Sequence, residues 1–450
     1  MDSRQFLSAL YNAAVTSVDP DRLVSEALGR RSDALYVRSI RREFVFAPSR
    51  VAMISVGKAA VPMAAAAHRV LGTRINEALV IAPTGTPTET LPPSFRFIGA
   101  SHPYPGADSV AAGAAALTCA ARLTADDLLL VLLSGGGSSL MAAPADGLTL
   151  EAKSKTVALM MAAGAPIADV NLVRGALSRV KAGRLAAAAG AADVVTLVLS
   201  DLGDDGWHLV ASGPTLGTPP SPADAVALLD RYRLRPLVPP AVRELLDAPH
   251  ERPPSAPDGH RWSVLLADIR TALDGARREA QRLGADARVI PELLKGEARA
   301  AARRLALAGA CAGNLVRRPG STPRRVVTLF GGETTVTVKG PGRGGRNREL
   351  ALASAYPIVG ATGATILVAG TDGIDHEPDA AGAFADHTTL ERAEALGLDP
   401  AKALTDNDTS PFFEALGDAF KPGPTGTNVG DIAFVLAPME ETPDAPEPAD

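Results

Sequence analysis

The sequence has few cysteines, few aromatic residues and no long apolar run. Its 450 residues include two cysteines, Cys119 and Cys311, and neither belongs to a CxxC pair. This favours buried thiols in a reducing cytoplasm over a disulfide framework. No apolar run reaches the ~20 residues that a membrane helix needs, and the N-terminal segment MDSRQFLSAL lacks the basic start and apolar stretch of a signal peptide. We therefore expect a cytoplasmic protein that does not enter a membrane.

The composition is that of a soluble globular protein. Aromatic residues make up 4% of the chain, so the core must be built mainly from Ala, Val and Leu. Hydrophobic residues make up 46% and charged residues 21%, as in soluble domains. The net charge of −5 argues against nucleic acid or an anionic membrane as the main partner.

Apolar segments that read as buried strands alternate with helical patterns. They are rich in Val, Ile and Leu, lack strict alternation and stop at Gly, Asp or Ser. The segments are 51–57, 78–83, 127–137, 194–202, 262–268, 287–292, 325–333, 364–373 and 431–438. Unbroken apolar strands are typical of sheets covered by helices on both faces, so we predict an α/β fold with mostly parallel sheets.

Proline-rich stretches divide the chain. The composition changes between 231 and 260, which places a linker at about 245–260. We therefore predict an N-terminal domain over 1–245 and a C-terminal domain over 261–438. The segment 316–325 reads as a surface loop, and the acidic, Pro-rich tail 439–450 reads as disordered.

LLSGGGSSL follows an apolar strand pattern and is the first candidate site. Its glycines, Gly135, Gly136 and Gly137, let backbone N–H groups turn toward one point, and Ser138 and Ser139 add hydroxyls. The sequence is neither a Rossmann fingerprint nor a Walker loop. A plain strand-to-helix turn is the alternative, and phosphate binding is the interpretation that we favour.

Two further strand ends carry charged residues. In SVGKAA, Lys58 follows a strand and precedes a helix, where a lysine can neutralise a phosphoryl group. In VLSDLGDD, Asp201 follows a strand and can hold Mg²⁺ or accept a hydroxyl proton. The alternatives are a solvated lysine and a helix-capping aspartate.

NLVRGALSRVKAGRLA (171–186) is a basic stretch that contains Arg174, Ser178 and Lys181. By itself it reads as a solvated helix face. Beside a phosphate loop, it could instead line an anionic crevice.

The stretch GGETTVTVKGPGRGGRNREL (331–350) contains Glu333, a short strand pattern at 334–338 and a Gly-rich loop with Arg346. Arginine has a planar fork suited to phosphate or carboxylate. Flexible nucleic-acid binding is the alternative. AGTDGIDHEPDAAGAF (369–384) groups acids around Asp372, and GPTGTNVGDI (423–432) offers Thr427 and Asn428 for a nucleotide contact.

In this order, SVGKAA, SHPYPG, LLSGGGSSL, NLVRGALSRVKAGRLA, LSDLGDD with ASGPT, GGETTVTVKGPGRGGRNREL, AGTDGIDHEPDAAGA and GPTGTNVGDI resemble the motifs of the MOFRL-type glycerate kinases. The resemblance spans roughly 50–437. It implies a two-domain α/β kinase with its active site in the cleft between the domains. Members transfer the γ-phosphoryl group of ATP to D-glycerate, usually at the 2-hydroxyl to give 2-phosphoglycerate, with a divalent cation such as Mg²⁺. The resemblance does not fix the oligomeric state, and a homodimer is one alternative.

The resemblance also assigns roles to residues. Lys58 and Arg346 match the family's basic pair, which we expect to stabilise phosphoryl charge. Asp201 is a candidate base or metal ligand, and Ser134 to Ser138 match the phosphate loop. The remaining expectations are nucleotide contacts at Thr427 and Asn428, substrate contacts at Arg174, Ser178 and Lys181, and metal ligands at Asp201, Glu333 and Asp372.

The chain departs from the family pattern at Gly175 and Ala176, where Lys and His are usual, at Gly106, where Asp is common, and at His376, where Gly is usual. One alternative is therefore a kinase for a related sugar acid, and another is an impaired binding relative. The family also carries the older label hydroxypyruvate reductase. However, no GxGxxG sequence directly follows any of the nine apolar segments, which argues against an NAD(P)H-dependent enzyme.

Overall fold

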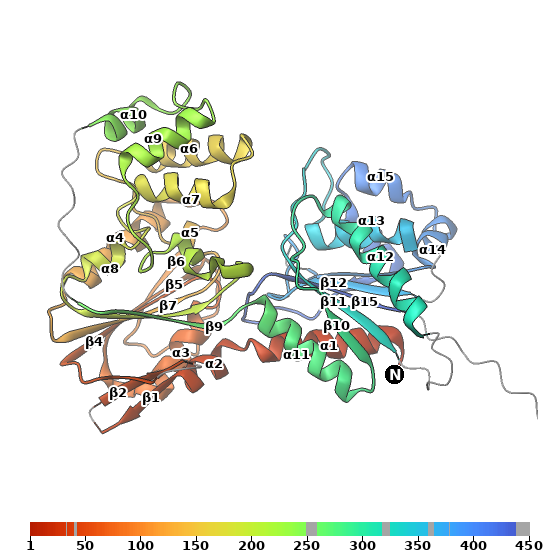
Figure 1. Cartoon of the computed structure of the whole chain (residues 1–450), viewed down its shortest axis with the longest axis horizontal. Coiled ribbons are helices and arrows are strands. Elements are labelled where there is room, and N and C mark those ends of the chain that lie inside the picture. The colour runs from red at the N-terminus through yellow and green to blue at the C-terminus, as the bar shows by residue number, and fades with distance from the viewer. Residues whose placement is uncertain are drawn as a thin grey trace, which may run out of the picture. The chain divides into compact units, whose positions relative to one another are not determined.

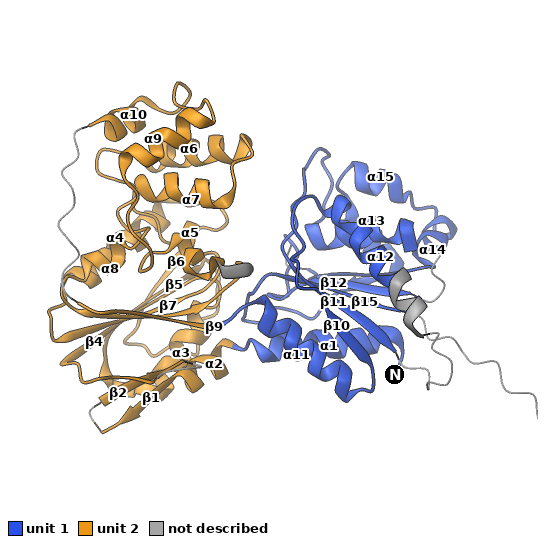
Figure 2. Cartoon of the chain, in the orientation of Figure 1, with its two compact units in different colours: residues 1–19, 267–450 blue, residues 20–266 orange. Residues whose placement is uncertain are grey.

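The computed structural model describes residues 1–32, 34–39, 43–248, 259–316, 325–358, 364–377 and 379–437, and for 204, 205 and 310–316 the backbone alone. The chain divides into two compact units, residues 20–266 (unit 2) and residues 1–19 with 267–450 (unit 1; Figure 2). Most of the predicted linker, the loop interior 317–324, the tail 439–450 and the Cys311 side chain lie outside the described residues.

Unit 2 is built on a six-stranded sheet with the order β6-β5-β4-β7-β8-β9 (Figure 1). The pairings from β6 to β8 are parallel, as the apolar segments predicted. The strands are Arg50–Val56 (β4), Ile75–Pro83 (β5), Arg96–Ala100 (β6), Asp127–Leu133 (β7), Asp193–Leu199 (β8) and Arg261–Ala267 (β9). A separate antiparallel sheet contains Leu28–Arg31 (β1), Ala34–Arg38 (β2) and Glu43–Phe46 (β3).

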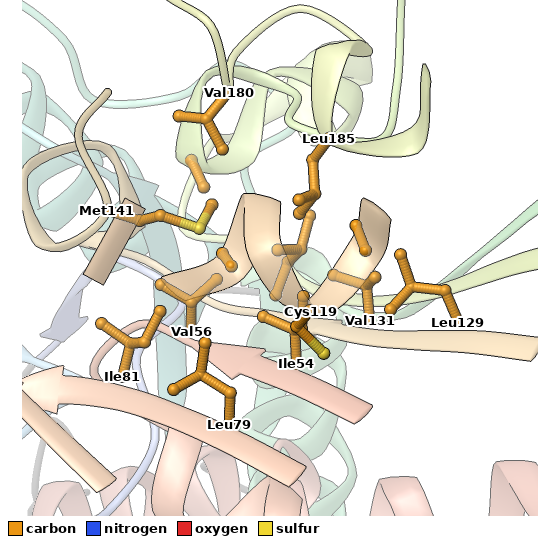
Figure 3. Packing of buried hydrophobic residues seen from close by; sticks show 14 of the residues in the cluster. Ile54, Val56, Leu79, Ile81, Cys119, Leu129, Val131, Met141, Val180 and Leu185 are labelled. Carbon is orange, nitrogen blue, oxygen red and sulfur yellow. The ribbon is translucent and has the colours of Figure 1, made fainter. Parts of the chain in front are cut away.

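Helices cover both faces of the parallel sheet, which explains why its strands are apolar throughout. One face carries α3, which packs on α2, and the other carries α4, α5 and α8 (Figure 1). On the second face, Ile54, Val131 and Leu185 belong to one buried cluster with Cys119 of α4 (Figure 3). The elements are Pro20–Ala27 (α2), Ala60–Leu71 (α3), Gly72–Arg74 (η1), Ala107–Ala121 (α4), Gly137–Leu140 (α5), Arg184–Ala188 (α8) and Asp204–Ser212 (η2).

Four helices of unit 2 form a second apolar core of their own. They are Leu150–Ala162 (α6), Ile167–Ala176 (α7), Pro222–Arg231 (α9) and Pro240–Asp247 (α10). Met160, Val173, Leu228 and Val242, one from each helix, are buried together in this core. The core holds α6 beside α7, which matters below because both helices carry buried basic residues.

Unit 1 contains a second six-stranded sheet, with the order β10-β11-β15-β12-β13-β14. The strands are Asp286–Val289 (β10), Val326–Gly332 (β11), Thr365–Gly370 (β12), Gly382–Asp386 (β13), Ala419–Phe420 (β14) and Asp431–Leu436 (β15). Only β10 and β11 pair in parallel, and the other pairings are antiparallel, which differs from the prediction of parallel strands. An apolar run indicates that a strand is buried on both faces of its sheet. The helices of unit 1 provide that burial whether neighbouring strands are parallel or antiparallel.

The helices of unit 1 also lie on both faces of its sheet. α1 and α11 pack on one face, and α12 and α13 pack on the other (Figure 1). The helices are Ser3–Ser17 (α1), Ile269–Arg282 (α11), Ala298–Val316 (α12), Arg346–Ile358 (α13), Thr389–Ala395 (α14), Pro400–Thr405 (α15) and Thr409–Leu416 (α16). Across the described ranges, none of the helices has the length and apolar character needed to span a membrane.

The first helix belongs to unit 1, whereas the predicted N-terminal domain over 1–245 included it. Asp2 caps α1 by accepting the N–H of Gln5. The buried residues Leu7, Leu10 and Ala14 recur at helical spacing, and Ser17 donates to the Thr271 carbonyl of α11. Gly275 of α11 permits this close approach, since a Cβ at that position would lie only 2.6 Å from the Ser17 Cβ.

All nine apolar segments form strands, which confirms that part of the prediction. The short strand predicted at 334–338 is wrong: Thr335 makes only an isolated bridge with Glu297, and Val338 is exposed. The segment 334–338 continues from β11 but does not pair with a neighbouring strand of the sheet.

Leu10→Ala should destabilise unit 1 selectively. Leu10 is fully buried in α1, and removing it costs about 2–5 kcal/mol of the free energy of unfolding. We expect faster hydrogen exchange at the amides of β12 and β15, with unchanged exchange in β4 and β7. Leu396→Ala, at an exposed leucine of unit 1, is the matched control. Faster exchange in β4 and β7 instead would assign α1 to the other unit.

Candidate functional site

Three neighbouring strand ends of unit 2 carry the predicted residues. In the parallel register, Val56 pairs with Leu133, and Leu133 pairs with Val198. The residues that follow β4, β7 and β8 therefore leave the sheet at the same edge. This brings Lys58, the loop 134–138 and Asp201 to one edge, where open α/β sheets bind ligands.

Ser134 joins two of these strand ends. It is fully buried, and its hydroxyl accepts the N–H of Ala59 at 3.0 Å. Its own N–H donates to the Val56 carbonyl, and the Lys58 N–H donates to the Gly135 carbonyl at 2.8 Å. The Ser134 hydroxyl is thus used inside the protein and does not point toward a ligand.

The glycines after Ser134 carry N–H groups that are not used in this way. Among the described residues, the N–H groups of Gly135, Gly136 and Gly137 donate to no acceptor. Gly136 has φ of 82°, and a Cβ there would lie 3.0 Å from the His102 ring and 3.4 Å from the Lys58 side chain. A left-handed glycine with adjacent N–H groups and a neighbouring lysine forms an anion-binding loop.

Asp201 lies two residues beyond β8 and is partly exposed. The preceding Ser200 donates to the Leu202 carbonyl and accepts the Leu202 N–H, so the backbone turns tightly around Asp201. The side chain of Asp201 is therefore carried on a fixed turn at the strand edge, which is consistent with the predicted role of base or metal ligand.

A cluster of four basic side chains lies beside the glycine loop, and we call it the basic cluster. Its members are Lys153 from α6, Arg174 from α7, Lys181 from the loop after α7, and Arg184 from α8. Lys153 is 6% exposed and Lys181 is 1% exposed. The alternative of a solvated helix face for 171–186 is therefore wrong at Lys181, which faces the interior.

Burial and mutual repulsion disfavour the charges of this cluster. Burial, with the fields of Arg174 and Arg184, lowers the pKa of Lys153 to about 7. The pKa of Lys181 is lowered well below its usual value by burial and by Lys153 and Arg174. Burial also lowers the pKa values of Arg174 and Arg184. No member forms an ion pair with a carboxylate of the described chain.

Polar side chains connect the basic cluster to the glycine loop. Arg174 donates to Asn171 at 2.7 Å and to the Ser212 hydroxyl at 3.3 Å. The Ser212 hydroxyl lies 2.6 Å from the hydroxyl of Ser138, the last residue of the predicted loop. Lys181 donates to the carbonyls of Gly137 and Ala211. The substrate contacts predicted at Arg174 and Lys181 thus adjoin the loop.

Ser178 has a different environment from its predicted partners. Its buried hydroxyl donates to the Ala143 carbonyl and accepts the N–H groups of Val180 and Lys181. These bonds shape the turn that carries Lys181. The structure therefore gives Ser178 a supporting position, and its predicted contact with substrate stays a prediction.

In unit 1, Arg346 lies where three strands meet. Asp431 pairs with both Gly332 and Gly370, so the ends of β11 and β12 lie beside the start of β15. Arg346 donates to both carboxylate oxygens of Asp431, at 2.5 and 3.0 Å, and lies 3.1 Å from Glu333. Burial, the largest influence, opposes its charge, but Asp431 and Glu333 outweigh it and raise the pKa of Arg346.

The Gly-rich loop of unit 1 is packed against another part of the chain. The N–H groups of Lys339 and Gly340 donate to Asn407, and that of Arg343 donates to Asp408. A Cβ at Gly340 would lie 2.3 Å from the Asp406 backbone. These glycines allow close packing, and the N–H groups of Lys339, Gly340, Gly342 and Arg343 are not available to an anion.

The other two arginines of this stretch are also paired. Arg348 is fully buried and bonds Asp375 and Asp379, while Arg343 pairs with Glu377. A flexible nucleic-acid-binding loop is therefore wrong for this stretch. The acidic cluster at 372–379 and the arginine loop, which the sequence presented as separate motifs, hold each other in place.

The remaining predicted residues of unit 1 serve local structure. Asp372 accepts the N–H of Ile374 in a tight turn. Thr427 donates to the Val18 carbonyl and ties its loop to the end of α1, while Asn428 accepts the N–H of Gly430. Their contacts with a nucleotide stay a prediction.

The predicted metal ligands do not form a ready-made metal site. Glu333 and Asp372 belong to unit 1, and Asp201 belongs to unit 2. Within the described ranges, no group of three or more His, Cys, Asp or Glu side chains could hold a metal ion. At the strand edge of unit 1, Arg346 already neutralises Glu333 and Asp431.

The departures from the family pattern have local structural explanations. A Cβ at Gly106 would lie 2.7 Å from Asp108, whose carboxylate occupies that space. A Cβ at Gly175 would face Ala182 and Pro220. His376 has φ of 65°, a left-handed conformation that glycine adopts without strain, which agrees with the glycine usual in the family.

Lys153, Asn171, Ser212 and Asp431 are functional candidates that the sequence analysis missed. Lys153 lies in LEAKSKT, where nothing distinguishes it from the exposed Lys155. Asp431 was included in an apolar strand, and only the register shows that it begins that strand beside two others. Ser212 directly precedes the Gly-Pro by which the sequence marks a turn.

The geometry defines a two-unit α/β protein with a candidate anion-binding glycine loop at the edge of a parallel sheet. Two family models match the chain: "Domain of unknown function (DUF4147)" over residues 6–247 and the MOFRL family over residues 326–431. D-glycerate 2-kinase of Thermotoga maritima is 35% identical over 95% of this chain and 96% of that protein. Glycerate 2-kinase of Pyrococcus horikoshii is 33% identical over 97% and 98%.

A crystal structure of glycerate kinase from Thermotoga maritima has a TM-score of 0.79 with 33% identity, and the match covers 96% of this chain and 99% of that one. An Agrobacterium vitis protein that carries hydroxypyruvate reductase as a provisional name is 38% identical over 86% of this chain and 99% of that protein. The chain therefore belongs to the MOFRL-type glycerate kinase family.

Lys153→Met should stabilise the protein in a pH-dependent way. Burial lowers the pKa of Lys153 from 10.5 to about 7, so between these values the unfolded chain binds more protons and stability rises with pH. At pH 7 and below, the buried charge of Lys153 lowers the free energy of unfolding by its full amount, on the order of 4 kcal/mol. Urea unfolding should show a gain for Lys153→Met that is largest near pH 7 and fades toward pH 10.

Lys155→Met, at an exposed lysine of the same helix, should leave the free energy of unfolding unchanged within about 0.5 kcal/mol. A gain for Lys153→Met that does not depend on pH would contradict the buried charge as its cause.

Proposed function

We propose that this protein is an ATP-dependent kinase that transfers the γ-phosphoryl group to the 2-hydroxyl of D-glycerate, giving 2-phosphoglycerate. The observation that carries the proposal is the glycine loop, whose three adjacent N–H groups lack acceptors in the described chain and whose Gly136 lies beside the Lys58 side chain. The relatives named D-glycerate 2-kinase and glycerate 2-kinase support the acceptor and its hydroxyl.

Each strand end of unit 2 has a role in this reaction. The N–H groups of Gly135 to Gly137 bind phosphate oxygens of the nucleotide, and Lys58 neutralises charge on the transferred group. Asp201 accepts the proton of the attacking hydroxyl. A new bond forms between that oxygen and the γ-phosphorus, the bond to the ADP oxygen breaks, and ADP leaves with the electron pair.

Arg346 is proposed as the second cation of the reaction. Its two-pronged pairing with Asp431 fixes the plane of the guanidinium, and its contact with Glu333 restrains a third nitrogen. Both acids hold the arginine in one orientation and keep it charged, as a cation that stabilises a transition state requires.

Mg²⁺ accompanies the nucleotide in this proposal, but the protein does not supply a complete site for it. Mg²⁺ in kinases is held largely by phosphate oxygens with one or two carboxylates, and then a single carboxylate from Asp201 or Asp372 suffices. We assign no step to the ion, since the described carboxylates form no metal cluster.

Hydride transfer is not supported by the structure. The sequence GPGRGG at 340–345 has GxGxxG spacing, yet no strand precedes it and its glycines pack against residues 406–409. A Rossmann fingerprint needs that strand and an open approach for a pyrophosphate.

The proposal is tested by incubating the protein with ATP, Mg²⁺ and a panel of hydroxy acids. We expect D-glycerate to give the highest kcat/KM, and phosphorus NMR to show 2-phosphoglycerate and ADP. Absence of a phosphorylated product, or oxidation of NADH with hydroxypyruvate, would refute the proposal. A higher kcat/KM for a longer sugar acid would replace the acceptor and leave the phosphoryl transfer in place.

Lys58→Ala and Arg346→Ala should each lower kcat by at least ~100-fold, the effect of removing a charge donor to the transition state. Arg346→Ala should also lose stability, because Asp431 would remain buried without a counter-charge. Steady-state kinetics and circular dichroism separate the two effects, and Lys155→Ala serves as control. Near-normal kcat in a folded variant would remove the role assigned to that residue.

A further inference from the structure

The basic cluster contains a lysine whose side chain is largely buried and whose amine has no partner in the described chain. Lys153 is 6% exposed and makes no hydrogen bond or ion pair with any described residue. Lysines in helices normally extend to water, as the exposed Lys155 does two residues later. Burying an ammonium without a partner is costly, so a missing anion is the simplest account of this arrangement.

The other members of the cluster are held by the protein itself. Lys181 donates to the carbonyls of Gly137 and Ala211, and Arg184 donates to the Gly175 carbonyl. Arg174 uses one nitrogen, Nη1, on Asn171 and Ser212. These bonds fix three cations around Lys153 but supply no negative charge, so the cluster keeps its attraction for an external anion.

The position of the cluster selects which anion it can take. Ser212, which Arg174 contacts, lies 2.6 Å from Ser138 at the end of the glycine loop. An acceptor acid must bring its hydroxyl to the phosphoryl group at that loop, and its one charged group is the carboxylate. An arginine and a lysine offer a fork and a point charge, which suit a carboxylate whose carbon lies two bonds from the reacting 2-oxygen.

We propose that Lys153 and Arg174 form a recessed subsite for the carboxylate of the acceptor acid, with Lys153 as its specificity-determining residue. The inference rests on the proposed kinase function for the identity of the acid. The carboxylate supplies the counter-charge that Lys153 lacks, while the Asn171–Ser212 pair keeps Arg174 in place. Neutral analogues of the acid leave Lys153 unsatisfied and bind weakly.

Proton uptake distinguishes this subsite from a purely structural lysine. The charged groups that act on the Lys153 amine are Arg174 from α7 and Arg184 from α8, and Lys181 repels it in turn. All of them are basic, and together with burial they lower the pKa of Lys153 to about 7, so at pH 8 the amine is largely neutral. Binding of a carboxylate beside it favours the charged form, and the complex takes up a proton from the buffer.

The test is isothermal titration of D-glycerate into the wild type, Lys153→Met and the control Lys155→Met at pH 8, in two buffers of different ionisation enthalpy. We expect Lys153→Met to weaken D-glycerate binding by about 10-fold or more, the loss of a charge-assisted hydrogen bond. Proton uptake should disappear in Lys153→Met alone. The Kd for ATP should stay within about threefold.

The amide of D-glycerate, which lacks the charge, should bind with the same Kd to all three proteins. Equal D-glycerate affinity in the wild type and Lys153→Met would overturn the subsite. Weaker ATP binding with unchanged D-glycerate binding would also overturn it, by assigning the cluster to a phosphate of the donor. Lack of turnover by the wild type would instead remove the kinase function, because the binding experiment does not depend on turnover.

Discussion

The hydroxyl of Ser134 holds the candidate site of unit 2 together. It accepts the Ala59 N–H at the start of α3, while the backbone on either side bonds the end of β4. Two strand-end loops are thereby locked to each other before any ligand is present. The N–H groups of the three glycines that follow donate to no acceptor among the described residues, so they remain for an anion.

Two glycine-rich loops of the chain have opposite functions. In the loop after β7, glycine gives a left-handed backbone at Gly136 and leaves N–H groups without acceptors. In the loop before α13, glycine permits the backbone at Gly340 to approach Asp406, and the N–H of Gly340 donates to Asn407. The contacts of the individual glycines, and not glycine content, therefore distinguish the two loops.

Much of the fold followed from the sequence, because continuous apolar runs report burial on both faces of a sheet. The same signal cannot report strand direction, and the sheet of unit 1 is accordingly more antiparallel than predicted. Residues at strand ends, such as Lys58 and Asp201, were predictable because glycine or serine marks the end of a strand. Lys153 was not, since burial of one helical lysine depends on how α6 packs against α7 and α10.

In the stretch 331–350, the sequence likewise did not show which partner each arginine side chain has. Arg343, Arg346 and Arg348 look alike in sequence, but their acidic partners lie 13 to 85 residues away along the chain. Only tertiary structure reveals that Arg348 is a buried anchor and that Arg346 is the partly exposed one.

The division of the chain has a consequence for its synthesis. Residues 20–266 are contiguous, whereas unit 1 needs both the segment before them and the segment after them. During translation, all of unit 2 therefore leaves the ribosome before the strands that cover α1 have been synthesised. Until then, the apolar side chains of Phe6, Leu7 and Leu10 in α1 are exposed to solvent. Unit 2 is an insertion within unit 1 and can fold early, whereas unit 1 can complete its fold only late in translation. During this interval, chaperones can bind its first helix.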